Sequence, residues 1–327
     1  MDASIPFPMP AAGAPASISA TDASPTERRL RVLVCGARGF IGRAVCRALR
    51  ARGHLVLEGV SRAGAEGVPM DFVRDQAAAD WLPRLRGVDV VVNAVGMLRS
   101  DRARPMQAVH EDAPCALFAA CAASGTRRVI QLSALGITDS PFAYARTKQG
   151  AERRLDALTR EGRLDGVIVR PSVVFGREGV SSRLFLALSR WPALLLPEVV
   201  RTRAIQPVAV DELAQVIAAL AEGKSAPAAA DAGATIIDAV GPEPVVVSDF
   251  IASLRAQSGA SSALVGRLPD ALARWSAGLG DRLPGVPWCS TTLALLARDN
   301  VGDPGPFAAL LGRPATAADR LLGAVQP

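Results

Sequence analysis

Three polar residues near the middle of the chain have the types and spacing of a proton-transfer site. Tyr144 and Lys148 are four residues apart in a stretch with helical spacing, so they lie on one face of the predicted helix. Ser133 stands eleven residues before the tyrosine, near the end of an apolar run over 127–136 that predicts a strand. We interpret these residues as a candidate catalytic set for hydride transfer, in which the serine holds a substrate carbonyl and the tyrosine exchanges its proton.

The lysine has the right charge to activate the tyrosine. A phenol of pKa about 10 works near neutral pH only if its pKa falls by roughly 3, which corresponds to about 4 kcal/mol. An ammonium group about 4 Å away supplies about 4 kcal/mol at an effective dielectric constant of about 20. The alternative is an ordinary helix surface, but Tyr144 is the only tyrosine in the chain.

The elements that would position this set begin with a glycine-rich turn. An apolar run from residue 29 leads into Gly36, Gly39 and Gly42, and a helical pattern continues to residue 49. The first glycine permits the tight bend, the second lets the backbone approach a pyrophosphate, and the third lets the helix pack against the sheet. Free N–H groups at the helix N-terminus then face the anion. We interpret the turn as a dinucleotide-binding site, with a glycine turn without a ligand as the alternative.

Two arginines near this turn favour a phosphorylated cofactor. The second predicted strand, 55–61, ends at Ser61 and is followed by Arg62, where an acidic residue would bind the ribose of NAD. An arginine there can pair with the 2′-phosphate of NADP, and Arg38 inside the turn can reach the same phosphate. The sequence therefore favours NADP(H) over NAD(H), with a solvated surface arginine as the alternative at each position.

The remaining segments alternate between strands and helices. Residues 87–96 and 165–176 are continuous apolar runs, which suit central parallel strands covered on both faces. Residues 106–124 have helical spacing and end at Gly125, a suitable C-cap. This alternation predicts an α/β fold with a doubly wound parallel Rossmann sheet and a smaller C-terminal substrate-binding domain.

Composition divides the chain into three parts. Residues 1–28 are rich in Pro, Ala and Ser without periodicity and predict a disordered leader. Residues 29–176 predict the NAD(P)-binding domain, to which residues 205–240 return. Residues 177–204 and 241–327, which carry no motif with a mechanism, are assigned to a smaller substrate or interface domain.

The overall composition argues against several classes of protein. The chain of 327 residues has 37 Lys and Arg against 31 Asp and Glu, and its arginines are dispersed, which suits an anionic cofactor and not nucleic acid. Five cysteines without a CxxC pair and two distant histidines indicate no metal site, no disulfide framework and a reducing compartment such as the cytoplasm. No run approaches 18 apolar residues, so a membrane-spanning helix is not predicted.

Together the motifs resemble a known superfamily. The set GARGFIG, NAVG, Ser133, YARTK and Arg170-Pro171 is similar to the short-chain dehydrogenase/reductase superfamily in its extended or atypical, epimerase-like form. The segments LSALG, YARTKQGAE, RPSVVFG, IQPVAVDELA and LLARDNV resemble the branch that contains the Rossmann-fold accessory subunit of respiratory complex I and its bacterial relatives. The resemblance implies a Ser133, Tyr144 and Lys148 catalytic set. It also implies that NADP(H) is contacted by Gly36, Arg38, Gly39, Phe40, Ile41, Gly42, Arg62, Asp71, Asn93, Ala94, Gly96, Lys148 and Pro171.

The resemblance leaves two functions open. A fourth polar catalytic residue, usually an asparagine on the helix over 106–124, is not evident, and His110 or Glu111 stands near its place. The first hypothesis is a cytoplasmic NADP-dependent oxidoreductase that acts on a carbonyl or alcohol as a monomer or homodimer. The second is a non-catalytic NADPH-binding subunit, assembly factor or redox sensor on a respiratory or membrane complex, peripheral at the inner membrane, since the branch includes members that hold NADPH as a structural element.

Overall fold

A parallel sheet of seven strands forms the centre of the protein, in the order β11-β6-β5-β4-β1-β2-β3. The structure is a computed structural model that describes residues 29–61, 66–100, 103–138, 140–224, 233–283, 286 and 288–325. The strands of the sheet are β1 (Arg31–Cys35), β2 (Leu55–Val60), β3 (Val68–Pro69), β4 (Val90–Asn93), β5 (Arg128–Leu132), β6 (Asp165–Pro171) and β11 (Thr235–Ala239). The predicted doubly wound Rossmann-type sheet is therefore confirmed. The expected leader, residues 1–28, and Arg62 lie outside the described residues.

The strand order creates a crevice at the ends of β1 and β4. The chain starts in the middle of the sheet with β1, adds β2 and β3 on one side, and then crosses over to place β4 on the other side. Cys35 at the end of β1 pairs with Asn93 at the end of β4. In open α/β sheets, ligands bind outside the carboxyl ends of the strands at such a reversal of strand order.

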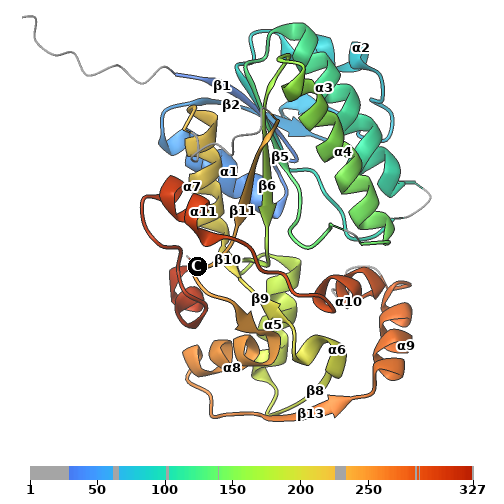
Figure 1. Cartoon of the computed structure of the whole chain (residues 1–327), viewed down its shortest axis with the longest axis vertical. Helices are drawn as coiled ribbons and strands as arrows, with labels where there is room; N and C mark the ends of the chain where they lie inside the picture. The colour runs from blue at the N-terminus through green and yellow to red at the C-terminus, as the bar shows by residue number, and fades with distance from the viewer. Residues whose placement is uncertain are drawn as a thin grey trace, which may run out of the picture.

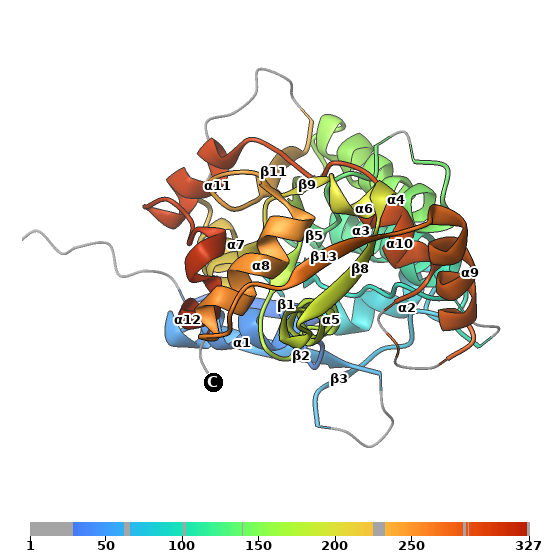
Figure 2. The same ribbon diagram turned by 90° about the horizontal axis from the view of Figure 1, so that it is seen from below.

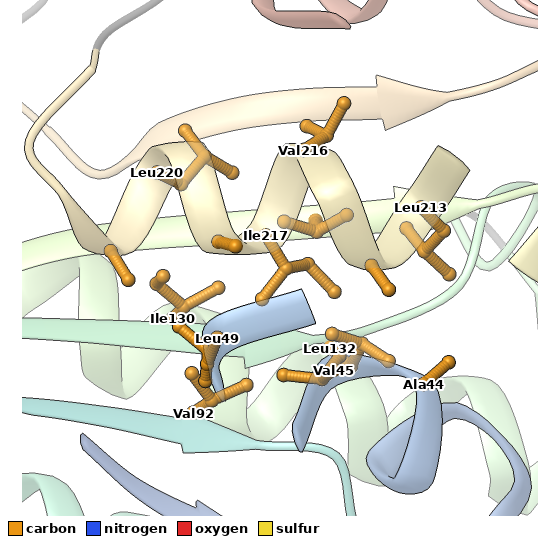
Figure 3. Packing of buried hydrophobic residues seen from close by; sticks show 14 of the residues in the cluster. Ala44, Val45, Leu49, Val92, Ile130, Leu132, Leu213, Val216, Ile217 and Leu220 are labelled. Atoms are coloured by element: carbon orange, nitrogen blue, oxygen red, sulfur yellow. The ribbon is translucent and has the colours of Figure 1, made fainter. Parts of the chain in front are cut away.

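Helices cover both faces of the sheet (Figure 1). One face carries α1 (Phe40–Ala51), α7 (Val210–Ala221) and α11 (Pro304–Leu311). The other face carries α2 (Ala78–Trp81), the 3-10 helix η1 (Leu82–Leu85), the π-helix η2 (Ala108–Asp112), α3 (Ala113–Ser124) and α4 (Ala143–Arg160). Figure 3 shows Ile217 of α7 pointing towards Leu49 of α1 and towards Val92 and Ile130 of the sheet. Strands covered on both faces explain the continuous apolar runs in the sequence.

The helix predicted over 106–124 forms in two parts. Its first part is the π-helix η2, and its second part is α3, which ends at Gly125 with a φ of 77°. The predicted glycine C-cap is therefore confirmed. A π-helical turn widens the backbone locally and is often found at functional sites.

A smaller domain lies beyond the carboxyl ends of the strands and appears at the bottom of Figure 1. Its helices are α5 (Val180–Arg190), α6 (Glu198–Arg201), α8 (Val247–Gln257), α9 (Asp270–Gly280), α10 (Ser290–Leu296), the 3-10 helix η3 (Ala318–Arg320) and α12 (Leu321–Ala324). Its short strands pair as β7 (Val174–Phe175) with β10 (Val208–Ala209), β9 (Ala204–Ile205) with β12 (Val245–Val246), and β8 (Ala193–Pro197) with β13 (Leu264–Leu268). Figure 2 shows β8, β13 and α9 on the outer side of this domain. Phe175, Phe185 and Phe250 meet edge to face in its core.

The end of the chain returns to the large domain. Phe307 of α11 is fully buried in the core that α1 and α7 share with the sheet. The buried carboxylate of Glu212 on α7 accepts hydrogen bonds from the backbone N–H and the hydroxyl of Thr316, at 3.0 and 2.8 Å. The segment 304–316 thus packs on the domain from which the sequence-based boundaries had separated it.

No helix among the described residues is long and apolar enough to cross a membrane.

Candidate active site

The glycine-rich turn between β1 and α1 has the geometry that its sequence predicts. Gly36 has a φ of 75°, a conformation that other residues rarely adopt. A Cβ atom on Gly42 would lie 2.1 Å from the carbonyl oxygen of Gly36, so only glycine lets the first turn of α1 approach the loop. Gly39 is the N-cap of α1, and its N–H donates to Gly36 O at 2.9 Å. The turn therefore presents the start of α1 to the crevice, where an anion is favoured.

Two adjoining cavities of about 740 and 630 Å³ run along this crevice, and we call them the cofactor cleft. They share Gly39, Val95, Gly96, Met97 and Arg104. The cleft is therefore continuous past the start of α1, as an extended dinucleotide would require. Of the residues predicted to contact the cofactor, its lining contains Gly36, Arg38, Gly39, Phe40, Ile41, Asp71, Ala94, Gly96 and Lys148.

Arg38 and Asp71 line the larger of the two cavities, whose lining contains no residue of α4. Arg38 is exposed, and its guanidinium donates to the backbone oxygen of Glu66 at 3.1 Å. Asp71 Oδ1 accepts a hydrogen bond from the backbone N–H of Val73 at 2.9 Å, which fixes the loop after β3. Both residues line the same cavity as the glycine turn, and neither side chain is buried in the protein core.

Gly42, Asn93 and Pro171, which were also predicted to contact the cofactor, do not line the cleft. Asn93 is fully buried and does not line the cleft, because its amide donates to Gln131 Oε1 at 2.8 Å and its oxygen accepts from Val95 N–H at 3.2 Å. Its side chain holds the loop after β4 in shape. Pro171 lies at the end of β6 on the wall of a third cavity, described below.

Lys148 lines the cleft and is hydrogen-bonded to the backbone near the ends of two strands. The side chain is 4 % exposed, and its Nζ donates to the backbone oxygens of Leu132 and Val95, at 3.0 and 3.3 Å. These oxygens belong to the end of β5 and to the loop after β4. Burial lowers the pKa of Lys148 to about 8, and the carboxylate of Glu152 one turn further along α4 opposes this effect.

Ser133 and Tyr144 line the cleft together with Lys148, as the sequence predicts. Ser133 follows β5 directly, and its buried Oγ has no hydrogen-bond partner among the described residues. Tyr144 is the second residue of α4. Burial raises the pKa of its phenol to about 12. This direction is opposite to the lowered pKa that was predicted from the nearby Lys148. The cause is the loss of hydration of the phenolate on burial, which spacing in the sequence does not reveal.

His110 completes the surroundings of Tyr144 and was only loosely indicated by the sequence. Its ring meets the tyrosine ring edge to face, with centroids 5.4 Å apart. His110 Nε2 accepts a hydrogen bond from Met97 N–H at 3.0 Å, and its Nδ1 lies 3.3 Å from Thr147 Oγ1. Burial, reinforced by the charge of Lys148, lowers the pKa of His110 to about 2. A neutral histidine on the π-helix therefore packs against Tyr144, near the place where the superfamily usually has an asparagine.

A third cavity of about 270 Å³, which we call the substrate chamber, opens from the same residues towards the smaller domain. Ser133 and Tyr144 line both the chamber and the cofactor cleft. The chamber is further lined by Leu135 and Pro171 from the large domain and by Leu184, Phe185 and Leu296 from the smaller one. The site thus has the layout of an enzyme that brings a small molecule against a dinucleotide.

The sequence profile of the NAD dependent epimerase/dehydratase family matches residues 32–195, slightly more than half of the chain. The protein belongs to this family. The matched region contains the glycine turn and the Ser133, Tyr144 and Lys148 set, and membership supports a nicotinamide cofactor in the cleft.

Two curated relatives are reductases. The chain is 26 % identical over 148 residues to a UDP-2-acetamido-2,6-beta-L-arabino-hexul-4-ose reductase from Pseudomonas aeruginosa, which covers 45 % of this chain. It is 27 % identical over 196 residues to a ceramide reductase from Caulobacter vibrioides, which covers 58 % of this chain. The matched stretches span only 37 % and 60 % of those relatives' lengths.

Solved structures extend the likeness of fold to the smaller domain. A crystal structure of a protein named gox2253 superposes with a TM-score of 0.63 at 20 % identity, over 90 % of this chain and 96 % of that one. A UDP-glucuronic acid 4-epimerase from Bacillus cereus, solved with UDP-glucuronic acid and NAD, superposes with a TM-score of 0.63 at 17 % identity, over 90 % and 97 % of the two chains. The family fold therefore covers nearly the whole chain.

Within the described residues, no group of three or more His, Cys, Asp or Glu side chains is arranged to hold a metal ion.

Proposed function

We propose that the protein is an NADP(H)-dependent oxidoreductase that transfers hydride between the nicotinamide and a carbonyl or alcohol carbon. The observation that carries the proposal is the position of Ser133 and Tyr144 on the shared wall of the cofactor cleft and the substrate chamber. Both curated relatives are named as reductases, which supports the same reaction type.

Each member of the set has a separate part in the reaction. The unpartnered Ser133 Oγ donates a hydrogen bond to the substrate oxygen. Tyr144 keeps its proton at neutral pH, since its pKa is about 12, so it donates that proton as a carbonyl is reduced. Lys148, whose ammonium group is held by two backbone carbonyls, lines the same cleft and contacts the cofactor there. The nicotinamide supplies or accepts the hydride when it is bound.

The glycine turn fits the pyrophosphate of such a cofactor. Gly36 and Gly39 line the cleft, and Gly42 lets the N-terminus of α1 pack close against the backbone of the turn. Arg38 on the wall of the cleft and the absence of an acidic residue at Ser61 and Arg62 support the choice of NADP over NAD.

The Tyr144→Phe substitution tests the reaction. We expect turnover with a panel of carbonyl compounds to fall by roughly 100-fold or more, because a general acid contributes about 10²- to 10⁴-fold. The dissociation constant of NADPH should stay within about threefold of wild type, since the phenol is not needed to hold the pyrophosphate. Unchanged turnover in Tyr144→Phe would contradict the proposed mechanism.

The choice of cofactor is tested by Arg62→Ala and Arg38→Ala. Each should weaken NADPH more than NADH, because charge-assisted hydrogen bonds to the 2′-phosphate are lost. Arg47→Ala is the matched control, since Arg47 lies on α1, does not line the cofactor cleft and pairs with Asp211 at 3.2 Å. Equal losses for the two cofactors would refute the NADP assignment.

A second candidate function is a non-catalytic NADPH-holding subunit at a membrane, as in the branch that contains the complex I accessory subunit. The favouring observation is an apolar surface on α9, where Leu272, Trp275 and Leu279 are 53, 70 and 45 % exposed. Trp191, before β8, is 64 % exposed. Tryptophan and leucine next to exposed arginines such as Arg274 are typical of a surface that enters the headgroup region of an anionic bilayer.

Sedimentation with vesicles of phosphatidylcholine and phosphatidylglycerol tests this surface. We expect the wild type to bind and Trp275→Ser to lose most binding, whereas Leu82→Ser, on the large domain with 39 % exposure, retains it. Absence of binding to vesicles would contradict this second function. Concentration-dependent dimerisation that requires Trp275 would show instead that the apolar surface on α9 binds a second copy of the protein.

A further inference from the structure

The substrate chamber has an uncharged wall. Among the described residues that line it, none has a charged side chain. Its polar lining residues are Ser133, Tyr144, Ser172, Ser181, Thr292 and Asn300. Arg99, Arg104 and Arg183 line the cofactor cleft and do not line the chamber. Because an anionic substrate requires cations or hydrogen-bond donors around its charge, this wall suits an uncharged and largely apolar molecule.

The chamber is small as well as apolar. Its volume of about 270 Å³ equals that of roughly nine water molecules at about 30 Å³ each. Phe40 and Leu98 line it on the side of the large domain, and Leu184 and Leu295 line it on the other. The chamber therefore holds the reacting end of a compact or chain-like molecule.

Asn300 is a polar chamber residue whose side-chain nitrogen is hydrogen-bonded and whose side-chain oxygen is not. Its Nδ2 donates to the backbone oxygen of Leu135 at 3.0 Å. Its backbone is held by the bond from its own N–H to Ala204 O, at 2.8 Å, and by Ser172 Oγ, which donates to its carbonyl oxygen at 3.0 Å. The neighbouring Asp299 accepts from Ala204 N–H at 3.0 Å. The residues D-N of the LLARDNV segment thus fasten this part of the chain to β9.

The carboxamide oxygen of Asn300 has no such bond. Oδ1 is buried and has no hydrogen-bond partner among the described residues. The bond to Leu135 O fixes which end of the amide is the nitrogen, so the free atom can only accept. A buried acceptor without a donor is costly. Among the side chains that line the chamber, only Ser133 shares this property, and Ser133 belongs to the proposed catalytic set.

We infer that the substrate chamber binds an uncharged, largely apolar carbonyl or alcohol, whose reacting oxygen meets Ser133 and Tyr144 and whose nearby hydroxyl or amide N–H donates to Asn300 Oδ1. The inference deepens the proposed oxidoreductase function and rests on it for the position of the reacting oxygen. The apolar lining selects the class of molecule, and Asn300 selects among members of that class.

A matched series of ketones tests the inference. Medium-chain ketones with a hydroxyl group one, two or three carbons from the carbonyl are each compared with the analogue that lacks the hydroxyl, and with a ketone of equal length that ends in a phosphate. NADPH-dependent turnover gives kcat/KM for each compound. The dissociation constants of the corresponding alcohols from protein saturated with NADP⁺ give a second readout that needs no turnover.

We expect at least one hydroxyl-bearing member to exceed its partner by roughly tenfold in kcat/KM and in affinity, which is the effect of one well-placed hydrogen bond. In Asn300→Leu, which has a similar shape but no acceptor, this ratio should fall to about one. Thr292→Val, at another polar position of the same wall, should keep the ratio.

The outcomes separate the two proposals. A preference for the phosphate-bearing ketone, or a ratio that Asn300→Leu leaves unchanged, would overturn the inference while the oxidoreductase function stands. Binding that shows the Asn300-dependent ratio without any turnover would support the chamber assignment and refute the proposed function. If Asn300→Leu does not fold, the wild-type ratios and the comparison with the phosphate-bearing ketone decide.

Discussion

Replacing Gly42 by alanine tests whether the glycine turn holds the cofactor in the way its geometry indicates. The added Cβ would lie 2.1 Å from Gly36 O and 2.8 Å from Gly36 C, both backbone atoms that cannot rotate away. Ordinary contact begins at 3.4 Å, so the start of α1 must move away from the turn by about 1.3 Å, the difference between these distances. The N–H groups of α1 then no longer meet the pyrophosphate at hydrogen-bond distance.

The size of the effect follows from what that contact contributes. A helix N-terminus stabilises an anion by up to about 2 kcal/mol, so losing it weakens NADPH binding by up to roughly 30-fold. Overpacking of the turn should also lower the free energy of unfolding by about 1 to 3 kcal/mol. Fluorescence titration with NADPH and urea denaturation measure the two effects separately.

Gly278→Ala is the matched control. Gly278 lies in α9, and a Cβ there would meet nothing within 4 Å, so the same chemical change should leave NADPH affinity unchanged and add up to about 1 kcal/mol of stability. Wild-type affinity in Gly42→Ala would refute the assignment of this turn to the pyrophosphate.

Three further predictions concern the buried groups behind the site. Glu152→Gln should lower the free energy of unfolding by roughly 2 to 4 kcal/mol in urea, since it breaks the two charge-assisted bonds to Arg170, at 2.9 and 2.6 Å. Burial lowers the pKa of Lys148 to about 8, so between pH 8 and 10 the unfolded chain binds more protons there and wild-type stability should rise with pH relative to Lys148→Met. His110→Ala should lower kcat by roughly tenfold, since Met97 N–H loses its acceptor and Tyr144 loses its edge contact.

Each of these predictions has its own contradicting result. Glu243→Gln, at an exposed glutamate, controls for loss of charge, and equal stability of the two variants would contradict a structural ion pair. A difference in unfolding free energy between wild type and Lys148→Met that stays constant from pH 8 to 10 would mean that folding does not lower the pKa of Lys148. The titration of the cysteines contributes equally to both proteins and cancels in the comparison. Loss of NADPH binding in His110→Ala would indicate a role in folding the cleft instead of one in turnover.

The local parts of the site could be predicted from the sequence. Gly36 and Gly42 were assigned their separate roles from spacing alone, because positive φ and close helix packing leave few other residue choices. Tyr144 and Lys148 were placed on one helix face because the helical repeat determines which side chains are neighbours. Continuous valine runs indicated strands covered on both faces, because such strands bury the side chains on both sides of the sheet.

The parts that depend on packing between distant segments could not be predicted. His110 reaches Tyr144 because its helix opens into a π-helical turn, and no sequence pattern marks that turn. Asn300 joins the chamber from a segment far along the chain, through bonds to Leu135 and Ala204. The raised pKa of Tyr144 follows from burial, which the distance between two residues in the sequence does not report. The NADP preference stays a prediction, since Arg62 lies outside the described residues.

The return of α11 to the large domain has a consequence for biosynthesis. Phe307 completes the core between α1, α7 and the sheet, and Glu212 accepts hydrogen bonds from Thr316 and forms an ion pair with Arg313. During translation the large domain therefore leaves the ribosome with the part of its apolar face beside α7 and β11 uncovered, and that part is covered only after almost the entire chain has been made. A polypeptide that stops before residue 304 should expose that face and depend on chaperones, although every residue of the cofactor cleft has already been made.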